Sequence, residues 1–196
     1  NVALDGNQDG WISYDVVGGT GGLMFVANLQ SRADAGSLGG GRRIEGPLTG
    51  LITPKGVRVI DGMVMVTDTT AKTISAFDLE DEGDVEPLFV IELGANNPAI
   101  WDFDYDEASD ILYCAGTNGD VVVFDDFLTD SGANGPTRTF SPAANGTKIS
   151  VNLHGIELAP GFLGDPDVLV LSDVGDATVA IDGQIFTIAD AEDANG

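Results

Sequence analysis

The feature that most constrains this sequence is a strand–turn–strand pattern that recurs along the chain. Between residues 56 and 67, two short apolar runs are joined by Asp61-Gly62, and a polar turn then leads into a third run at residues 73–78. Asp-Gly between apolar runs is a strong hairpin signal, because both central residues of such a turn need positive φ. Residues 87–93 add a further apolar run. This segment therefore predicts four consecutive antiparallel strands.

The plan recurs in four copies. Their second strands share the pattern apolar, apolar, small, turn-forming, at residues 25–28, 65–68, 113–116 and 170–173. Helical periodicity is nearly absent, and Gly-, Ser- and Asp-rich residues 28–41 and 126–136 predict loops. We predict an all-β fold, a β-propeller of about four four-stranded antiparallel blades. It forms a single domain over residues 1–196, with repeats at approximately 11–48, 52–94, 97–142 and 149–196.

The two ends of the chain leave two arrangements open. The last copy has three predicted strands, at residues 153–158, 168–172 and 183–188, with an acidic loop expected at 173–182. Residues 1–4 predict a strand with no blade of its own. Pairing of these terminal strands would close a four-bladed ring and remove exposed sheet edges. Alternatively, the chain is part of a larger propeller.

Three stretches of the chain resemble propeller repeats of the NHL/YVTN class, namely PKGVRV…MVMVTD…TISAFDL, ILYCAGTNGDVVVFD and HGIELAP…VLVLSD. The resemblance covers most of residues 11–188. It implies the propeller fold and leaves the activity open, because the class includes hydrolases, lyases, receptors and structural modules.

The charge balance excludes one class of partner. The chain has 32 acidic residues against 8 Lys and Arg, and its formal net charge is −24. Such a surface repels phosphate backbones, so we expect no nucleic-acid binding. The acidity has two explanations, a solvated surface suited to saline surroundings or a supply of oxygen ligands for Ca²⁺. No apolar run is long enough to span a membrane.

The cellular compartment of the protein is indicated by weaker sequence signals. Cys114 is the single cysteine and lies in an apolar run, which predicts a buried structural thiol and excludes an intrachain disulfide. The chain begins with Asn1 and not with Met, as expected of a processed protein or of a fragment. Asn145-Gly146-Thr147 is a glycosylation sequon. We therefore expect a secreted or cell-surface protein.

The sharpest motif is the acidic run at residues 5–13. It matches the front of a calcium loop, in which oxygen ligands at alternate positions surround a hard cation. The predicted ligands are the side chains of Asp5, Asn7 and Asp9, the carbonyl of Trp11, and Ser13 directly or through water. Val16 stands where an EF-hand needs Glu, so the alternative is an Asx-rich turn without an ion.

Two other polar groups are candidates for a site in a central channel. Asp102, Asp104 and Asp106 alternate along a predicted strand, or else residues 104–110 form only a polar turn. His154, the only histidine, begins a strand of the last copy close to Asn152. A lone His provides no metal cluster by itself, and a structural role is the simpler interpretation.

These observations favour a non-catalytic extracellular module that binds a protein partner or its own copies and is stabilised by calcium. The alternative is a propeller hydrolase of lactonase or esterase type with a cation in the channel, held by Asp102, Asn152 or His154. No nucleophile–base motif of known spacing is present, so we expect no catalytic residues.

Overall fold

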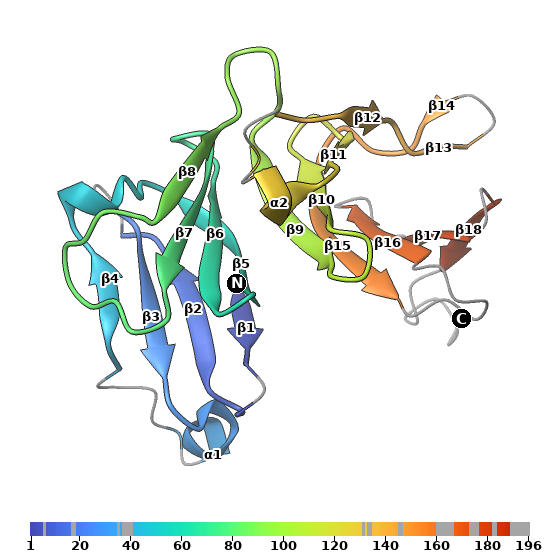
Figure 1. The fold of residues 1–196 in the computed structure, drawn as a ribbon. Coiled ribbons are helices and arrows are strands. Elements are labelled where there is room, and N and C mark those ends of the chain that lie inside the picture. Colours follow the sequence, from blue (N-terminus) through green and yellow to red (C-terminus); the bar gives the residue numbers. More distant parts are fainter. Residues whose placement is uncertain are drawn as a thin grey trace. The chain divides into compact units, whose positions relative to one another are not determined.

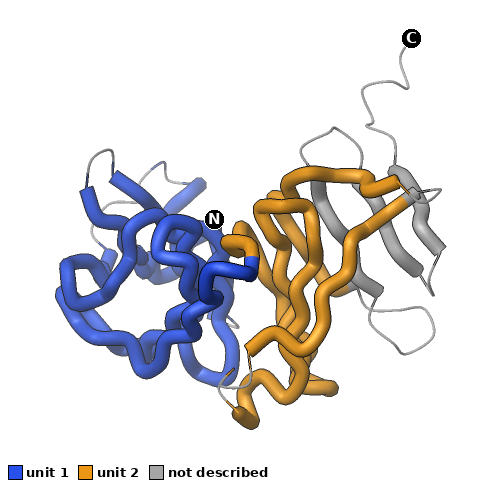
Figure 2. Tube along the Cα trace, turned by 90° about the horizontal axis from the view of Figure 1, so that it is seen from above, with its two compact units in different colours: residues 1–97 blue, residues 98–196 orange. Residues whose placement is uncertain are grey.

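The structure is a computed structural model of the chain, and it describes residues 1–5, 7–16, 19–34, 36, 41–130, 132, 135–144, 147–159, 167–172, 177–181 and 184–188. The chain divides into two compact units, residues 1–97 and 98–196 (Figure 2). Each unit contains two four-stranded antiparallel sheets with strands in sequence order (Figure 1). The predicted plan of four repeated sheets is confirmed.

The first sheet consists of β1 (Val2–Leu4), β2 (Gly10–Tyr14), β3 (Gly22–Val26) and β4 (Arg43–Glu45). The prediction that residues 1–4 have no blade of their own is wrong. Val2 pairs with Ile12 and Leu4 with Gly10, so β1 is the first strand of this sheet. The sheet therefore begins before residue 11, where we placed the first repeat.

The place of one strand in the order of the first sheet also differs from the prediction. The apolar run ending at Asn28, which we aligned with the second strands of the other copies, is β3, the third strand. The second strand is β2, which follows the acidic loop. The sequence pattern misled because the third strand is also followed by a turn-forming residue, Asn28, with φ of 51°.

The second sheet follows its prediction closely. It consists of β5 (Pro54–Ile60), β6 (Met63–Asp68), β7 (Thr73–Asp78) and β8 (Phe89–Glu92). Asp61 and Gly62 form the predicted turn, with φ of 47° and 73°. These two positive φ values match a two-residue hairpin loop with the twist of the flanking strands.

The core of the first unit lies between the first and second sheets. Alternate residues of β1 to β4 face the second sheet, and Trp11, Leu23 and Ile44 are almost fully buried. They pack with Val57 and Phe77 of the second sheet. Strand alternation thus gives the first sheet one buried face, which packs against the second sheet.

The third sheet consists of β9 (Ile100–Asp106), β10 (Ile111–Gly116), β11 (Val121–Phe124) and β12 (Arg138–Phe140). Strand β9 extends through Asp106, so the polar turn starts later than the predicted residue 104. A two-stranded ribbon, β13 (Ala143–Ala144) and β14 (Thr147–Lys148), follows.

The fourth sheet is complete, which corrects the prediction of three strands. It consists of β15 (Leu153–Ala159), β16 (Asp167–Ser172), β17 (Ala177–Ile181) and β18 (Gln184–Ile188). The additional strand, β17, lies in the segment that we expected to be an acidic loop. Its residues ATVAI are small and β-branched, and they fit a pleated ladder despite the acids around them. Its neighbours, residues 173–176 and 182–183, lie outside the described residues.

Short helices occupy parts of the predicted loops. They are α1 (Leu29–Asp34) and α2 (Phe127–Asp130), whereas the 3₁₀ turn η1 (Pro47–Thr49) lies outside those loops, after β4. The Asp110 carboxylate accepts hydrogen bonds from the main-chain N–H groups of Leu128 and Thr129 at 2.7 and 3.0 Å, which supplies partners at the start of α2. Within the described ranges, no helix is long and apolar enough to cross a membrane.

Candidate functional site

The predicted calcium loop is the hairpin loop between β1 and β2. Asp5 Oδ1 accepts hydrogen bonds from the main-chain N–H groups of Asn7 at 2.8 Å and Asp9 at 3.0 Å, which is an Asx turn. Asp9 Oδ1 accepts the main-chain N–H of Asn28 at 2.7 Å. These two carboxylates therefore hold the hairpin and tie it to the turn before α1.

The other two predicted ligands lie outside this loop. Trp11 and Ser13 are in strand β2, with side chains buried against the second sheet. The Trp11 ring contacts the Phe25 ring at 5.3 Å between centroids, and Ser13 Oγ donates to the main-chain oxygen of Lys55. The loop itself thus brings together Asp5, Asn7 and Asp9. Among the described residues, no group of three or more His, Cys, Asp or Glu side chains is placed to hold a metal ion.

The three alternating aspartates of β9 have different surroundings. Asp102 is buried. Asp104 Oδ2 accepts the main-chain N–H of Leu158 in β15 at 2.6 Å, which links the first strands of the third and fourth sheets. Asp106 Oδ1 accepts the N–H of Ala108 at 3.0 Å in the following turn. Each of the latter two carboxylates therefore has a structural partner.

His154 belongs to a small polar cluster in the second unit. Its ring stacks on Trp101 of β9, with 4.5 Å between centroids and 23° between planes. The Asn152 side-chain nitrogen lies 2.8 Å from His154 Nε2. Asn152 Oδ1 is buried and has no hydrogen-bond partner within the described part of the chain. A buried amide oxygen of this kind is suited to a water molecule, a donor group or a cation.

Trp101 was missed in the sequence and could have been found there. Each of the strands β9 and β15 has a bulge at its start, opposite Gly116 and Ser172 respectively. Trp101 and His154 are the extra residues of these bulges, so they occupy equivalent positions. Alignment of AIWDFD with NLHGIE places them in the same column. Bulges re-aim side chains, which accounts for the stacking of these two rings.

Cys114 is not available as a nucleophile. Its side chain is fully buried in β10, and this burial, with the nearby Asp102 charge, raises the pKa of the thiol well above its ordinary value. The thiol is therefore protonated near neutral pH. The expectation of a buried structural cysteine is confirmed.

A further surface was not anticipated from the sequence. It is the face of the first sheet that points away from the second sheet, formed by Val2, Leu4, Ile12 and Met24, and we call it the open face. Val2 is 48% exposed and Leu4 61% exposed, although Ala3 between them is buried. Ladder pairing places Val2, Ile12 and Met24 side by side. The open face is therefore a contiguous apolar surface.

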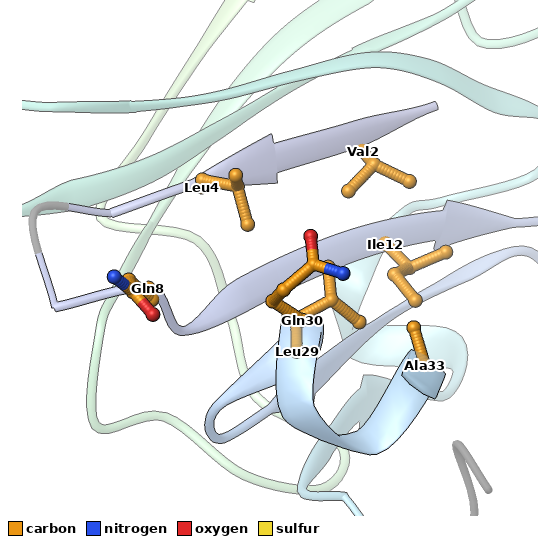
Figure 3. A pocket seen from close by; sticks show the side chains of 7 residues that line it. All are labelled: Val2, Leu4, Gln8, Ile12, Leu29, Gln30 and Ala33. Carbon is orange, nitrogen blue, oxygen red and sulfur yellow. The ribbon is translucent and has the colours of Figure 1, made fainter. Parts of the chain in front are cut away.

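Helix α1 borders the open face and turns it into a groove. The groove has a volume of about 510 Å³ and is lined by Val2, Leu4 and Ile12 from the strands, Leu29, Gln30 and Ala33 from α1, and Gln8 (Figure 3). Gly10 allows this arrangement, because a Cβ at this position would lie 2.4 Å from Leu29 Cδ2. The groove walls are mostly apolar, and Gln8 and Gln30 are the polar residues among those that line it.

The other end of the open face is polar. Tyr14, two residues after Ile12 in β2, donates its hydroxyl hydrogen to Glu45 Oε2, and the Arg43 guanidinium lies 5.9 Å from its ring centre. Burial and the Glu45 carboxylate raise the pKa of Tyr14 to about 12. An apolar centre with a polar rim is the usual composition of a protein interface.

The structure resembles solved propeller-type structures. It matches the WD40 domain of coronin from Toxoplasma gondii over 96% of this chain, with a TM-score of 0.62 and 15% identity. It matches hydrazine synthase from Kuenenia stuttgartiensis over 96% as well, with a TM-score of 0.60 and 13% identity. The chain spans 45% and 48% of those two chains, less than half of either. No family model and no curated protein gives a significant match to the sequence. The predicted all-β propeller class is confirmed.

Proposed function

We propose that this protein is a non-catalytic binding and assembly module that acts outside the cell and uses the open face as its contact surface. The observation that carries the proposal is the exposure of Val2, Leu4 and their neighbours as one apolar surface. Large exposed apolar patches on soluble proteins mark sites of association. The polar rim at Tyr14, Glu45 and Arg43 fits a protein partner better than a lipid surface, which the chain's net charge of −24 would repel.

The way in which carboxylates are used supports a non-catalytic role. Asp68, fully buried, accepts main-chain hydrogen bonds from Ile52, Thr53, Thr70 and Ala71. Asp110 accepts hydrogen bonds at the start of α2. Carboxylates that hold turns are structural elements of the repeat, and they leave fewer acids for general acid–base chemistry.

The finer parts of the proposal rest on the sequence. Secretion is supported by the acidic composition and by the glycosylation sequon Asn145-Gly146-Thr147. Membership of the NHL/YVTN class is supported by the quoted repeats, and calcium binding by Asp5, Asn7 and Asp9 in one hairpin. An ion there would stabilise the loop that contributes Gln8 to the groove.

The calcium proposal is tested by thermal unfolding with and without Ca²⁺. A ligand that binds the folded state raises the melting temperature by mass action. Asn7→Ala removes a predicted ligand side chain and keeps the Asp5 turn, which uses the main-chain N–H of Asn7. We expect Ca²⁺ to raise the melting temperature of the native protein more than that of Asn7→Ala. Equal shifts, or none, would contradict a site in this hairpin.

The binding proposal is tested with a photoreactive residue at position 4, compared with the same residue at position 48. Leu48 lies in η1, outside the open face, and is 53% exposed. We expect position 4 to give a discrete covalent product with a protein, either another copy or a component of the secreted fraction of the source organism. We also expect Ile12→Glu to suppress that product. Products of equal yield from both positions, or none from position 4, would refute the proposal.

A hydrolase is the second candidate, and one observation favours it. Asn152 Oδ1 is buried without a partner among the described residues, next to the exposed His154. A cation bound there could polarise a lactone or ester carbonyl. Hydrolysis of model lactones and esters that is lost in His154→Ala would support this candidate and contradict a non-catalytic role. Turnover that does not exceed the buffer rate would remove it.

A further inference from the structure

The open face of the first sheet has a counterpart in the second sheet. The last ladder pair between the second and third strands is Tyr14 with Gly22 in the first sheet and Asp68 with Thr73 in the second. Two residues earlier, Ile12 corresponds to Val66. Their partners on the first strands are Val2 and Val57, so these two valines are equivalent positions in the repeat.

The fourth sheet provides the same comparison in the second unit. Its first strand pairs Leu153 with Ser172 at the position where the second sheet pairs Pro54 with Asp68. Counting back two residues from Ser172 gives Val170, whose partner is Ile156. Ile156 is therefore the equivalent of Val57 and of Val2.

Two of the three equivalent residues are buried, and the third is exposed. Val57 is 0% exposed and packs with Trp11 and Leu23 of the first sheet. Ile156 is 1% exposed and packs with Val121 and Val123 of the third sheet. Val2 is 48% exposed. In each unit, then, this face of the later sheet is covered by the sheet that precedes it, and the same face of the first sheet is open.

The equivalence defines what would cover the open face. In both units the covering surface is the opposite face of another four-stranded sheet, represented by Trp11 and Leu23 in the first sheet and by Val121 and Val123 in the third. A partner that continues this packing is a further blade of the same kind. A single helix or an extended peptide would leave most of a four-stranded face uncovered.

We propose that the open face receives the fourth sheet of a second copy of this chain, in the packing that the first sheet makes with the second. This inference rests on the proposed binding function and identifies its partner. The repeat supports a second copy, because the fourth sheet is a four-stranded blade of the same kind as the sheets that cover Val57 and Ile156. The same contact made twice, once by each copy, closes a symmetric pair.

Charge determines how this association depends on salt. Each copy has a net charge of −24, so two copies repel each other at low ionic strength. Burial of Val2, Leu4 and Ile12 is an apolar contribution that salt does not weaken. Association therefore strengthens as salt is added, opposite to the behaviour of a contact built on ion pairs.

The test is sedimentation velocity of the pure protein over a wide range of concentration, in low and high salt. We expect a species of twice the 20.3 kDa monomer mass that is favoured by salt. Leu4→Glu should weaken association at least about a hundredfold, because two contacts each lose an apolar side chain and gain a charge. Leu48→Glu adds the same charge at an exposed site outside the open face and should leave association unchanged.

Three results would overturn this inference. They are a monomer at every concentration and salt, equal effects of Leu4→Glu and Leu48→Glu, and growth beyond two copies into open chains. Matching circular dichroism spectra and melting temperatures of the two variants establish that both fold. A monomer whose photoreactive position 4 still captures a different secreted protein would overturn the second-copy inference alone and leave the proposed binding function standing.

Discussion

Replacement of Asp68 by Ala is expected to be among the most destabilising single changes in the first unit. The Asp68 carboxylate is fully buried at the end of β6. Its Oδ2 accepts the main-chain N–H groups of Ile52 and Thr53 at 2.6 and 2.8 Å. Its Oδ1 accepts those of Thr70 and Ala71 at 2.9 and 2.8 Å. The side chain thus joins the entry of β5 to the turn after β6.

The magnitude follows from these four hydrogen bonds. Bonds to a charged acceptor contribute about 1.5–3 kcal/mol each, and donors left buried without a partner carry a further penalty. Water that enters the vacated space recovers part of this loss, so we expect Asp68→Ala to lower the free energy of unfolding by about 3–5 kcal/mol. Asp78→Ala is the matched control, because Asp78 is exposed and accepts the N–H of Glu80 at 2.8 Å in an ordinary turn. It should cost about 1 kcal/mol or less.

The assay is urea unfolding followed by tryptophan fluorescence in a Trp101→Phe background, so that the signal comes from Trp11 in the first unit. The slope of the free energy against urea should stay constant between variants, which would show that the midpoint shift reports stability. If Asp68→Ala lies within about 0.5 kcal/mol of Asp78→Ala, the network around Asp68 does not hold this blade and the reasoning fails.

Two further predictions concern the second unit. Burial raises the pKa of Asp110, but hydrogen bonds from Leu128, Thr129 and Tyr105 outweigh it and hold the pKa below its ordinary value. Its stabilising contribution is therefore present above the unfolded pKa of about 4 and is lost as pH falls through the lower folded pKa. Unfolding at acid pH should show a shallower loss of stability in Asp110→Asn than in the native protein, and parallel curves would contradict this. Gly119 has φ of 82°, and a Cβ there would lie 2.1 Å from the Ser150 carbonyl oxygen, whereas Gly62 has φ of 73° and open space around it. Thermal unfolding should therefore show that Gly119→Ala is more destabilising than Gly62→Ala by about 1–3 kcal/mol, because only Gly119→Ala adds steric overlap to the backbone strain. Equal losses of stability in the two variants would refute the close approach of Ser150 to Gly119.

The sequence predicted the second and third sheets because their signals are local. Asp61-Gly62 specifies its own turn, and β-branched residues flank it on both sides. The first sheet was harder to predict, since β1 has three residues and an acidic loop separates it from its partner. Strand β17 was missed because its small residues stand among acids that suggested a solvated loop.

The candidate sites also differ in how far the sequence could predict them. Asp5, Asn7, Asp9, Asn152 and His154 could be named from sequence because their chemistry is visible residue by residue. The open face could not be predicted. Alternation shows that Val2 and Leu4 lie on one side of β1, but only packing shows whether a neighbouring sheet covers that side. The contrast with buried Val57 became visible once the ladder register had made the two positions equivalent.

The most direct measurement maps where a photoreactive residue at position 4 attaches when copies with natural and heavy isotopes are mixed. The account predicts a covalent product between light and heavy copies, with the attachment point in the fourth sheet, between residues 153 and 188. Attachment within a single copy would show that the chain closes on itself. Attachment between copies but outside the fourth sheet would contradict the blade-to-blade packing from which the proposed assembly was derived.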